Sequence, residues 1–507
     1  ANRFSAFAMG VSGAAVEMGT RAQIALVCAR WRANDLPGAL KAIDNLQKKQ
    51  PDRALAYQLR GRVQLMQRQI PAATQSFEAA LAKEPGFFPA IASLAAIDLD
   101  AGKPEVARKR FEDHAKADPK SHQAHLALAE LAQRTGAEPA AVLQHLRNAV
   151  KANAGELQPH LLLVSHLLGT GDTAAALTAA REGAAALPNS PELKETLGRA
   201  QMAAKDAASA VVTFRQLTAL HDTNPVYRVR LAEALVETQD FAGARRALEE
   251  ALTLRPDFTP ARRALMTVAM RENKPQEAIA LAREIQKAVP RDPEGFLLEG
   301  DVENARRNHD QAVAAYRKAL DLRKASDIAM RLHMALLNAG RQAEADKLAA
   351  DWNRGNPKDA VFRFYEGDIA LQRGDLAAAE GHYRAVLAAQ PRNALAMNNV
   401  AYLLVKQGKP GALDLANKAN ELLPGRPQMM DTLALALAAD KKLPQAIEVQ
   451  KSAISRAPND PSLKLTLARL LIQSGDKAYA RAELEDLAKL GSRFRDQAEV
   501  GKLLATL

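Results

Sequence analysis

The stretch "LQKKQPDRALAYQLRGR", residues 46–62, places a single proline, Pro51, between an apolar helix-like run and an alanine-rich one. The same arrangement returns at a constant spacing of 34 residues, between Pro51 and Pro85, Pro85 and Pro119, Pro256 and Pro290, Pro357 and Pro391, and Pro424 and Pro458. Proline cannot continue a helix interior, because its ring fixes φ and removes the backbone N–H. The spacing therefore predicts a chain of helical hairpins, each ended by a proline that lets the next hairpin begin.

Fourteen repeats result when the recurrent proline is placed at position 32 of a 34-residue unit. They start near Thr20, Ala54, Phe88, His122, Leu157, Pro191, Pro225, Thr259, Pro293, Ser326, Ala360, Ala394, Pro427 and Pro461. The repeat from His122 needs one extra residue, and those from Pro293 and Ala394 need one fewer. Where the proline is missing, at Asp222 and Lys324, we expect the same turn.

Small and large residues alternate in a fixed pattern within these repeats. Position 20 is alanine in all fourteen, including Ala141, and position 8 is often glycine, as at Gly61 and Gly367. Position 24 often carries a ring, as at Phe77 and Tyr383. Two helices approach closely only where side chains are small, so we expect each ring of the second helix to fill the space beside the small residue of the first. Turns such as "QRGD" and "QSGD" should place glycine in the left-handed conformation that ends a helix.

The composition of the 507-residue chain agrees with an all-α fold. Apolar residues make up 48% of the sequence but aromatic ones only 4%, which is typical of helices packed through small side chains. The net charge of +11 could suit an anionic partner. Both signs are mixed along the chain, however, so the pattern does not favour nucleic acid. No apolar run is long enough to span a bilayer, and Cys28, the single cysteine, can form no intrachain disulfide.

Small residues at positions 8 and 20, a ring near 24 and proline at 32 resemble the tetratricopeptide repeat over residues 20–490. The resemblance implies an α-solenoid, a right-handed superhelix of about fourteen hairpins whose first helices line a concave groove. Residues 491–507 place Val500, Leu503, Leu504 and Leu507 on one face, which suits a helix that caps the last repeat. We interpret residues 1–19 as the remaining helix of a severed upstream repeat.

Within that superfamily, three segments resemble the C-terminal part of large repeat lipoproteins encoded with bacterial exosortase and PEP-CTERM sorting systems. These segments are "RAQIALVCARWRANDLPGALKAIDNLQKKQPD", "FLLEGDVENARRNHDQAVAAYRKAL" and "NALAMNNVAYLLVKQGKPGALDLANKANELLPGRPQMMDTLALAL". The resemblance implies a full protein anchored by a lipidated cysteine upstream of Ala1, on the periplasmic side of the bacterial cell envelope. A cytoplasmic location stays open on the sequence alone. Cys28 has no lipobox around it and is not that anchor.

No motif for catalysis or cofactor binding is found in the sequence. It has no phosphate loop, no zinc-protease helix and no nucleophile turn. The segment "GTGDTA", residues 169–174, matches a dinucleotide pattern but lies between two helices, where that chemistry needs a preceding strand. His122 and His125 are close enough on one helix to share a metal, but no further ligand completes a site. We therefore expect no enzyme activity, no metal and no cofactor.

The predicted groove is formed by positions 2, 5, 9, 12 and 13 of the first helices, which share one side of a 3.6-residue period. The binding candidates at these positions are Arg62, Arg199, Arg263, Arg271, Asp301, Phe364, Asp368, Asn398, Tyr402 and Asp431. Among them Asn398, Tyr402 and Asp431 could converge on a peptide backbone or a sugar hydroxyl. The alternative is that these three side chains cap and tie neighbouring helices. Only Asn398 and Asn399 resemble the clamp of chaperone-tail receptors, so we do not expect such a ligand.

The tripeptide "EGD" occurs twice and places Glu299 and Glu366 at position 7, which is usually leucine. A carboxylate at a normally buried position must be hydrogen-bonded or paired. It could organise a polar seam in a binding groove, or it could be neutralised by an arginine or backbone amide nearby. The sequence leaves both roles open.

Three functions follow from these observations. The first is a non-enzymatic scaffold that binds a protein or peptide in the groove, in envelope exopolysaccharide assembly or export or in PEP-CTERM protein sorting by resemblance. The second is binding of an anionic polymer, polysaccharide or nucleic acid, through the net positive charge, with affinity that falls steeply with salt. The third is a targeting arm for an enzyme whose catalytic domain lies upstream.

Overall fold

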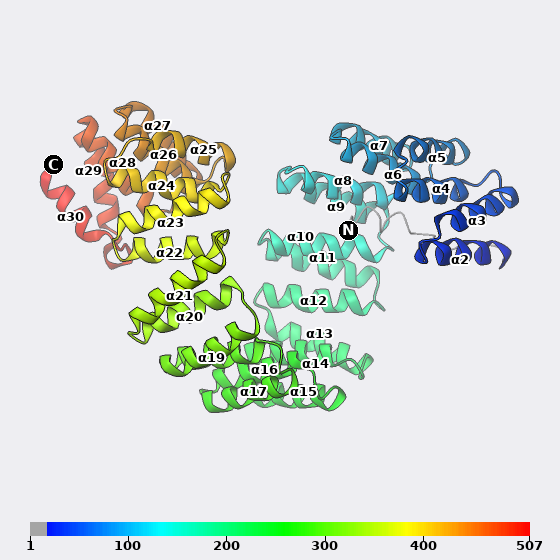
Figure 1. Ribbon diagram of the computed structural model, residues 1–507, viewed down its shortest axis with the longest axis horizontal. Helices are drawn as coiled ribbons and strands as arrows, with labels where there is room; N and C mark the ends of the chain where they lie inside the picture. Colours follow the sequence, from blue (N-terminus) through cyan, green and yellow to red (C-terminus); the bar gives the residue numbers. More distant parts are fainter. Residues whose placement is uncertain (1–17) are drawn as a thin grey trace. The chain divides into compact units, whose positions relative to one another are not determined.

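The computed structural model describes residues 18–507, and in these residues the secondary structure is helical, with no β-strand. The chain divides into two compact units: unit 1 ends at Val268 and unit 2 spans Ala269–Leu507. Within each unit the helices alternate between the first and the second helix of successive hairpins (Figure 1). The all-α solenoid predicted from the sequence is therefore confirmed. The predicted remnant helix at residues 1–19 lies almost wholly outside the described residues.

The first helices of the hairpins are 12 to 15 residues long. They are α2 (Met18–Arg32), α4 (Ala54–Met66), α6 (Phe88–Asp100), α8 (His122–Arg134), α10 (Leu157–Gly169), α12 (Pro191–Ala203), α14 (Pro225–Glu237), α16 (Thr259–Arg271), α18 (Glu294–Ala305), α20 (Ser326–Asn338), α22 (Ala360–Gln372), α24 (Ala394–Lys406), α26 (Pro427–Ala439) and α28 (Pro461–Ser474). Every predicted repeat start lies within two residues of one of these helix starts.

The second helices end at a fixed distance before the recurrent proline. They are α3 (Leu36–Lys49), α5 (Ile70–Lys83), α7 (Pro104–Ala117), α9 (Pro139–Ala152), α11 (Thr173–Ala186), α13 (Ala207–Leu220), α15 (Phe241–Leu254), α17 (Pro275–Ala288), α19 (His309–Leu322), α21 (Gln342–Gly355), α23 (Leu376–Ala389), α25 (Ala412–Leu422), α27 (Leu443–Arg456) and α29 (Lys477–Ala488). Pro51 follows the last residue of α3 by two positions, and Asp222 and Lys324 follow α13 and α19 by the same interval. At Asp222 the predicted turn is present, since the N–H of Asn224 donates to the carbonyl of His221 as that of Arg53 donates to Gln50. At Lys324 the prediction is wrong, because the connection 323–325 is one residue shorter than 221–224 and contains no turn.

The turn inside each hairpin contains one residue in the left-handed conformation, except between α24 and α25, where Gly408 and Gly411 both adopt it. In the predicted glycine turns, Gly374 has φ of 76° and Gly475 has φ of 87°. The same conformation is adopted without glycine at Arg68, Gln239 and Lys441, where φ is between 60° and 63°. The hairpin geometry is thus kept even where the residue lacks glycine's freedom.

The predicted contact between small residues and rings is confirmed. A Cβ added to Gly61 would lie 2.5 Å from a ring atom of Phe77, and one added to Gly367 would lie 2.6 Å from a ring atom of Tyr383. Real Cβ atoms do not approach so closely, so only glycine admits the ring at this distance. Because the ring belongs to the second helix and the glycine to the first, this contact sets how close the two helices of a hairpin lie.

One register assignment is wrong. Ala141 was placed at the buried alanine position of its repeat, but it is exposed, and Val142 is buried in its place. The connection from α8 to α9 has four residues, 135–138, whereas the connections from α4 to α5 and from α6 to α7 have three. The extra residue therefore lies before α9 and moves every side chain of that helix by one position.

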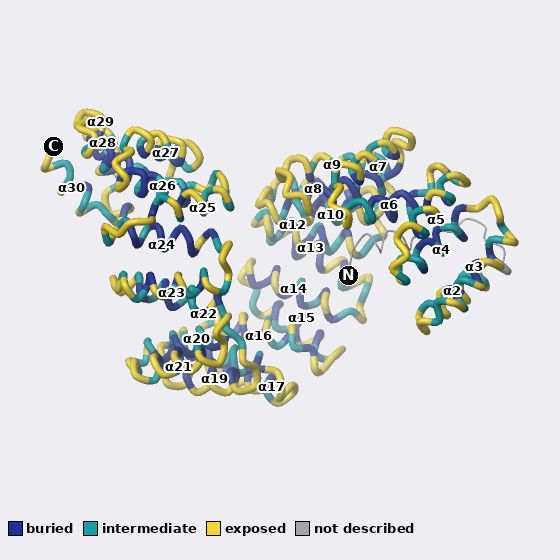
Figure 2. The backbone as a smooth tube through the Cα atoms, turned by 45° about the horizontal axis from the view of Figure 1, so that its top comes forward, coloured by how far each residue is buried: buried dark blue, intermediate teal, exposed yellow. Residues whose placement is uncertain are grey.

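The core of each unit is a series of small apolar clusters, each shared by a hairpin and the first helix that follows it. One such cluster joins Phe88 of α6, Phe111 of α7 and Leu128 of α8. Figure 2 shows long buried stretches along first helices such as α6, α24 and α26. The first helices are buried on more sides because they contact helices before and after them, as in α10 with both α9 and α12. Stability in such a stack comes mainly from neighbouring helices.

The last helix of unit 2, α30 (Gln497–Thr506), follows a short 3₁₀ helix at Gly491–Arg493. Val500 is fully buried in a cluster with Leu465 and Leu484, and Leu503, Leu504 and Leu507 pack against the same cluster. Arg469 of α28 donates to Glu499 of α30, with nitrogen to oxygen distances of 2.9 and 2.6 Å. The apolar face predicted for this segment is the face that packs on the last hairpin. No helix within residues 18–507 has the length and apolar character needed to cross a membrane.

Candidate binding groove in unit 1

A cavity of about 1400 Å³ lies along α8 and α10 of unit 1. Its lining also includes residues of α9 and of the turns before α8 and α10. We call this cavity the α8–α10 groove. From α8 it is lined by Gln123, Leu126, Ala129, Glu130 and Gln133, and from α10 by Gln158, Leu161, Leu162, Ser165, His166 and Gly169.

These lining residues occupy the repeat positions that the sequence pattern assigns to a groove. Gln123, Leu126, Glu130 and Gln133 are positions 2, 5, 9 and 12 of the repeat from His122, and Gln158, Leu161, Ser165 and Gly169 are positions 2, 5, 9 and 13 of the next. The spacing of three and four residues places each set on one side of its helix. The position rule thus describes the groove, although none of these residues is among the ten candidates.

One end of the groove is formed by the turns that precede α8 and α10. Ser121, the residue before α8, accepts a hydrogen bond from the N–H of Ala124 at 3.4 Å and is 3.1 Å from Nε2 of His114. Asp118, Lys120, His122 and Glu156 line the same end. Burial lowers the pKa of His114 and of His122, although Asp118 and Glu156 act in the opposite direction. Both imidazoles are therefore neutral at pH 7.

The charged groups of the groove are mainly acidic. Asp118, Glu130 and Glu156 line it, against one lysine, Lys120. Phe88 is the only aromatic side chain apart from histidine among the described lining residues, and it is just 4% exposed. The groove therefore offers carboxylates, side-chain amides and apolar patches to a ligand, and no open aromatic surface.

The candidates predicted in unit 1 lie apart from this groove. The guanidinium of Arg62 lies 4.5 Å from the centre of the Trp31 ring, which is a cation–π contact between α4 and α2. Burial lowers the pKa of Arg62. Arg199 and Arg263 are exposed on α12 and α16.

Two acidic candidates of unit 2, Asp301 and Asp368, are held by the rings that pack on the glycines. The hydroxyl of Tyr316 donates to Asp301 at 2.7 Å, and Arg331 also pairs with Asp301. The hydroxyl of Tyr383 donates to Asp368 at 2.5 Å. Burial, followed by the hydrogen bond to the aspartate, raises the pKa of both tyrosines. The two aspartates thus fix the rings in place.

Two further binding candidates predicted from the sequence are Phe364 and Arg271. Phe364 is half-buried, and its ring centre is 5.1 Å from that of Tyr383. Arg271, the last residue of α16, is exposed. Phe364 therefore also belongs to the packing around the tyrosine.

The trio Asn398, Tyr402 and Asp431 is not joined by any hydrogen bond of the described chain. Asp431 instead accepts hydrogen bonds from Gln450 of α27, at 2.7 Å, and from Thr466 of α28. Burial raises the pKa of Asp431 despite these bonds. Asn398 is buried and donates to Asn399 at 3.4 Å, and its side-chain oxygen has no hydrogen-bond partner. Tyr402 lies under Nζ of Lys406, 5.5 Å from the ring centre.

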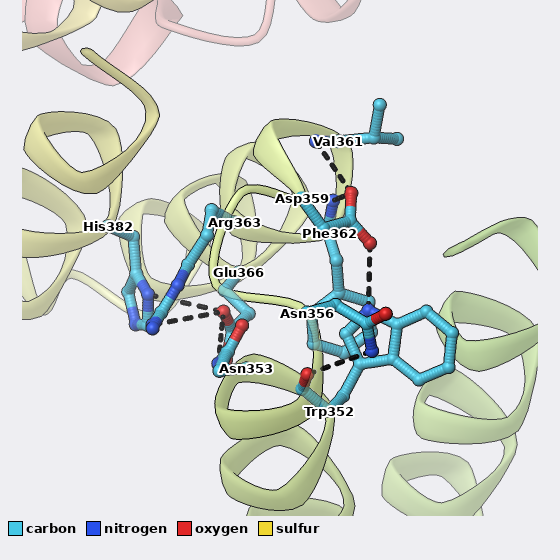
Figure 3. Close-up of polar contacts among 9 residues, drawn as sticks. All are labelled: Trp352, Asn353, Asn356, Asp359, Val361, Phe362, Arg363, Glu366 and His382. Atoms are coloured by element: carbon cyan, nitrogen blue, oxygen red, sulfur yellow. Dashed lines mark hydrogen bonds and ion pairs between the residues drawn. The ribbon is translucent and has the colours of Figure 1, made fainter. Parts of the chain in front are cut away.

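Glu299 and Glu366 are both held by hydrogen bonds and ion pairs within the protein. Glu299 pairs with Arg283 at 2.8 Å and accepts from Gln286 at 2.6 Å. Glu366 accepts from Asn353 at 2.9 and 3.0 Å and lies 3.7 Å from Arg363 and 3.4 Å from His382 (Figure 3). In both cases an amide from the preceding second helix reaches the carboxylate. Of the two roles that the sequence left open, the contacts match pairing with nearby groups and not a polar seam in a binding groove.

A further polar hub, which the sequence reasoning did not identify, surrounds Asp359 (Figure 3). Its carboxylate accepts from the N–H groups of Val361 and Phe362 at 3.1 and 3.2 Å and so caps α22. It also accepts from the indole N–H of Trp352 at 2.8 Å and from Ser326 at 2.7 Å. One carboxylate thus joins α20, α21 and α22. An aspartate before a helix predicts the cap, but only the fold brings the other two donors to it.

Glu380 of α23 provides a test of electrostatic stabilisation. It accepts from Lys409 and Arg384, each at 2.8 Å, and these bonds lower the pKa of Glu380 from 4.5 to about 2. A carboxylate with a lowered folded-state pKa contributes stability above its ordinary pKa and loses it as pH falls through the folded value. We expect Glu380→Gln to lower the melting temperature at pH 7, and the difference from wild type to vanish between pH 4.5 and about 2.

A series of thermal melts across that pH window measures the effect. Glu448→Gln, at an exposed glutamate paired with Lys451 at 3.4 Å, serves as the matched control and should change the melt little at any pH. A constant difference between wild type and Glu380→Gln down to pH 2 would contradict the assignment.

The histidines do not form the metal pair considered from the sequence. His122 lines the groove, while His125 interacts electrostatically with His145 of α9. Among the described residues there is no group of three or more His, Cys, Asp or Glu side chains arranged to hold a metal.

The fold and the groove together define a class of protein: helical-hairpin repeat arrays whose first helices present a binding surface. Two family models, both described as tetratricopeptide repeat, match this chain, one at residues 24–86, 94–156 and 364–427 and the other at 235–301 and 437–507. These matches cover more than half of the sequence. The chain belongs to the tetratricopeptide repeat superfamily, whose members are generally non-enzymatic scaffolds that bind proteins.

Individual relatives match shorter parts of the chain. Cellulose synthase operon protein C of Komagataeibacter xylinus is 26% identical over 193 residues, which cover 36% of this chain and 15% of that protein. A TPR repeat-containing protein of Pseudomonas aeruginosa is 29% identical over 141 residues, 26% of this chain and 24% of its own length. The crystal structure of yeast Tom70 aligns with 90% of this chain and 99% of its own, at 15% identity and a TM-score of 0.37.

Proposed function

We propose that this protein is a non-enzymatic scaffold that binds a partner protein through the first helices of its repeats. The observation that carries the proposal is the α8–α10 groove, a cavity of about 1400 Å³ lined by the groove positions of two successive repeats. A cavity of this size lined by apolar and amide side chains suits a segment of polypeptide.

The cellular setting we propose is exopolysaccharide assembly or export in the bacterial envelope. The similarity to cellulose synthase operon protein C supports this setting. Attachment through a lipidated cysteine upstream of Ala1 and a link to PEP-CTERM sorting belong to the same proposal, and they rest on the sequence resemblance alone.

Capture from a bacterial envelope extract tests the scaffold function. Ser165 is exposed in the middle of the groove, on α10, so Ser165→Trp should fill the groove without disturbing the core. Ser452→Trp is a matched control at an exposed serine of α27, in unit 2. We expect wild type and Ser452→Trp to retain the same proteins and Ser165→Trp to lose them, with equal helical signals for all three.

Retention of the same proteins by Ser165→Trp would show that the groove is not the binding surface. Tyr402→Ala and Asn398→Ala, each checked for unchanged melting, would then report on the first helices of unit 2. If only acidic polymer is retained, by all variants alike and with a steep loss as salt rises, binding through the net charge of +11 replaces the scaffold proposal.

A further inference from the structure

We infer that the α8–α10 groove selects an extended segment of four or five residues that carries a lysine or arginine side chain. The inference rests on the proposed scaffold function and adds the chemistry of the ligand to it. It follows from the length of the groove, the sign of its charges and the kind of polar groups that line it.

The length of the groove sets the length of the segment. From Gln123 to Gln133 the α8 side covers ten residues, which at 1.5 Å per residue span about 15 Å. An extended chain advances about 3.3 Å per residue, so four or five residues fill this distance. A helix that fills the same distance would have about ten residues and just under three turns, a length that is marginal for an isolated helix in water.

The charge of the groove is opposite in sign to that of the whole chain. Asp118, Glu130 and Glu156 outnumber Lys120, and burial lowers the pKa of His114 and of His122, so the formal charge of the groove is negative. The complete sequence carries +11. A like-charged acidic segment would meet carboxylates in a partly enclosed space, whereas a basic side chain gains charge-assisted hydrogen bonds there.

The neutral polar groups of the groove favour a peptide over a sugar. Gln123, Gln133 and Gln158 each present an amide that can both donate and accept, which matches the alternating N–H and C=O groups of an extended backbone. Sugar sites commonly use an exposed aromatic face, but Phe88 is 4% exposed here. Leu161 and Leu162, both half-buried on α10, supply apolar surface for the stem of a long basic side chain.

Fluorescence polarisation with two pools of labelled hexapeptides tests the inference. Both pools have capped ends and mixed neutral residues, and the central residue is fixed as lysine or arginine in one and as aspartate or glutamate in the other. We expect the basic pool to bind the full chain at least tenfold more tightly. Glu130→Gln combined with Glu156→Gln should reduce that preference to about threefold or less, since both carboxylates lose their charge.

Glu138→Gln is the matched control, because Glu138 is an exposed carboxylate just before α9 and is not part of the groove lining. It should leave the preference unchanged. Equal binding of both pools, tighter binding of the acidic pool, or a basic preference that survives the double substitution would each overturn the inference.

The scaffold function and the ligand chemistry fail in different ways. If Ser165→Trp abolishes envelope capture but the two peptide pools bind equally, the groove is a protein site without the inferred charge selectivity. If Ser165→Trp retains the same proteins as wild type, the scaffold function proposed for this groove is wrong, and the inferred ligand chemistry is wrong as well.

Discussion

Replacing Asp359 with alanine should lower the free energy of local unfolding around α20, α21 and α22 by about 2–4 kcal/mol. Loss of the helix cap costs about 1 kcal/mol. The indole N–H of Trp352, which is 7% exposed, would also lose its acceptor, and an unsatisfied buried donor costs about 1–3 kcal/mol. Hydrogen exchange of the amides in these three helices measures the effect, because an array of this length need not unfold in one step.

Asp375→Ala is the matched control for this substitution. Asp375 is exposed and caps α23 by accepting from the N–H of Ala378 at 2.9 Å. Its loss should therefore cost only the cap, about 1 kcal/mol. Equal effects of the two substitutions would mean that the contacts from Trp352 and Ser326 to Asp359 add no stability.

Adding one methyl group at Gly367 should destabilise unit 2 by about 1–2 kcal/mol, although alanine favours helix formation. The new Cβ would lie 2.6–2.9 Å from three ring atoms of Tyr383. That ring is fully buried and fixed by its hydrogen bond to Asp368, so it cannot move away cheaply. Overpacking costs about 1–3 kcal/mol, and the gain in helix propensity returns at most about 1 kcal/mol.

Gly381 of α23 offers the opposite case in the adjacent helix. An added Cβ there meets no atom within 4 Å, so Gly381→Ala should raise stability by up to about 1 kcal/mol. Hydrogen exchange and thermal melting of the two variants should thus shift in opposite directions. A stabilising Gly367→Ala would show that the ring does not hold the two helices at their observed distance.

The repeat architecture could be predicted from the sequence because its signals are local and repeated. Proline follows most second helices by two positions, and the pairing of Gly61 with Phe77 or Gly367 with Tyr383 depends on residues 16 positions apart. The alternatives left open at Glu299 and Glu366 are decided by amides on the preceding second helices. Such contacts depend on which side chain a neighbouring repeat carries, and the repeat pattern does not specify that.

The site was harder to predict than the fold. Eight of the cavity-lining residues on α8 and α10 fall at positions 2, 5, 9, 12 and 13 of their repeats. The candidates at these positions were predicted from charge and rings, and several of them belong to repeats where those side chains are tied to neighbours. Asp368 holds Tyr383, and Asp431 is held by Gln450 and Thr466. Glutamine, leucine and serine account for nine of the 25 residues that line the cavity. These residue types do not by themselves indicate a binding site in a sequence. Only their positions on two neighbouring first helices show that they line a cavity.

The additional residue between α8 and α9 is a local interruption of an otherwise regular repeat. Ala137, Pro139 and Val142, which lie in and just after this longer connection, all line the α8–α10 groove. Each repeat is stabilised mainly by its immediate neighbours, so a fault of one residue is absorbed locally and the periodic order resumes on either side. The α8–α10 groove thus lies where one additional residue breaks the period of the array.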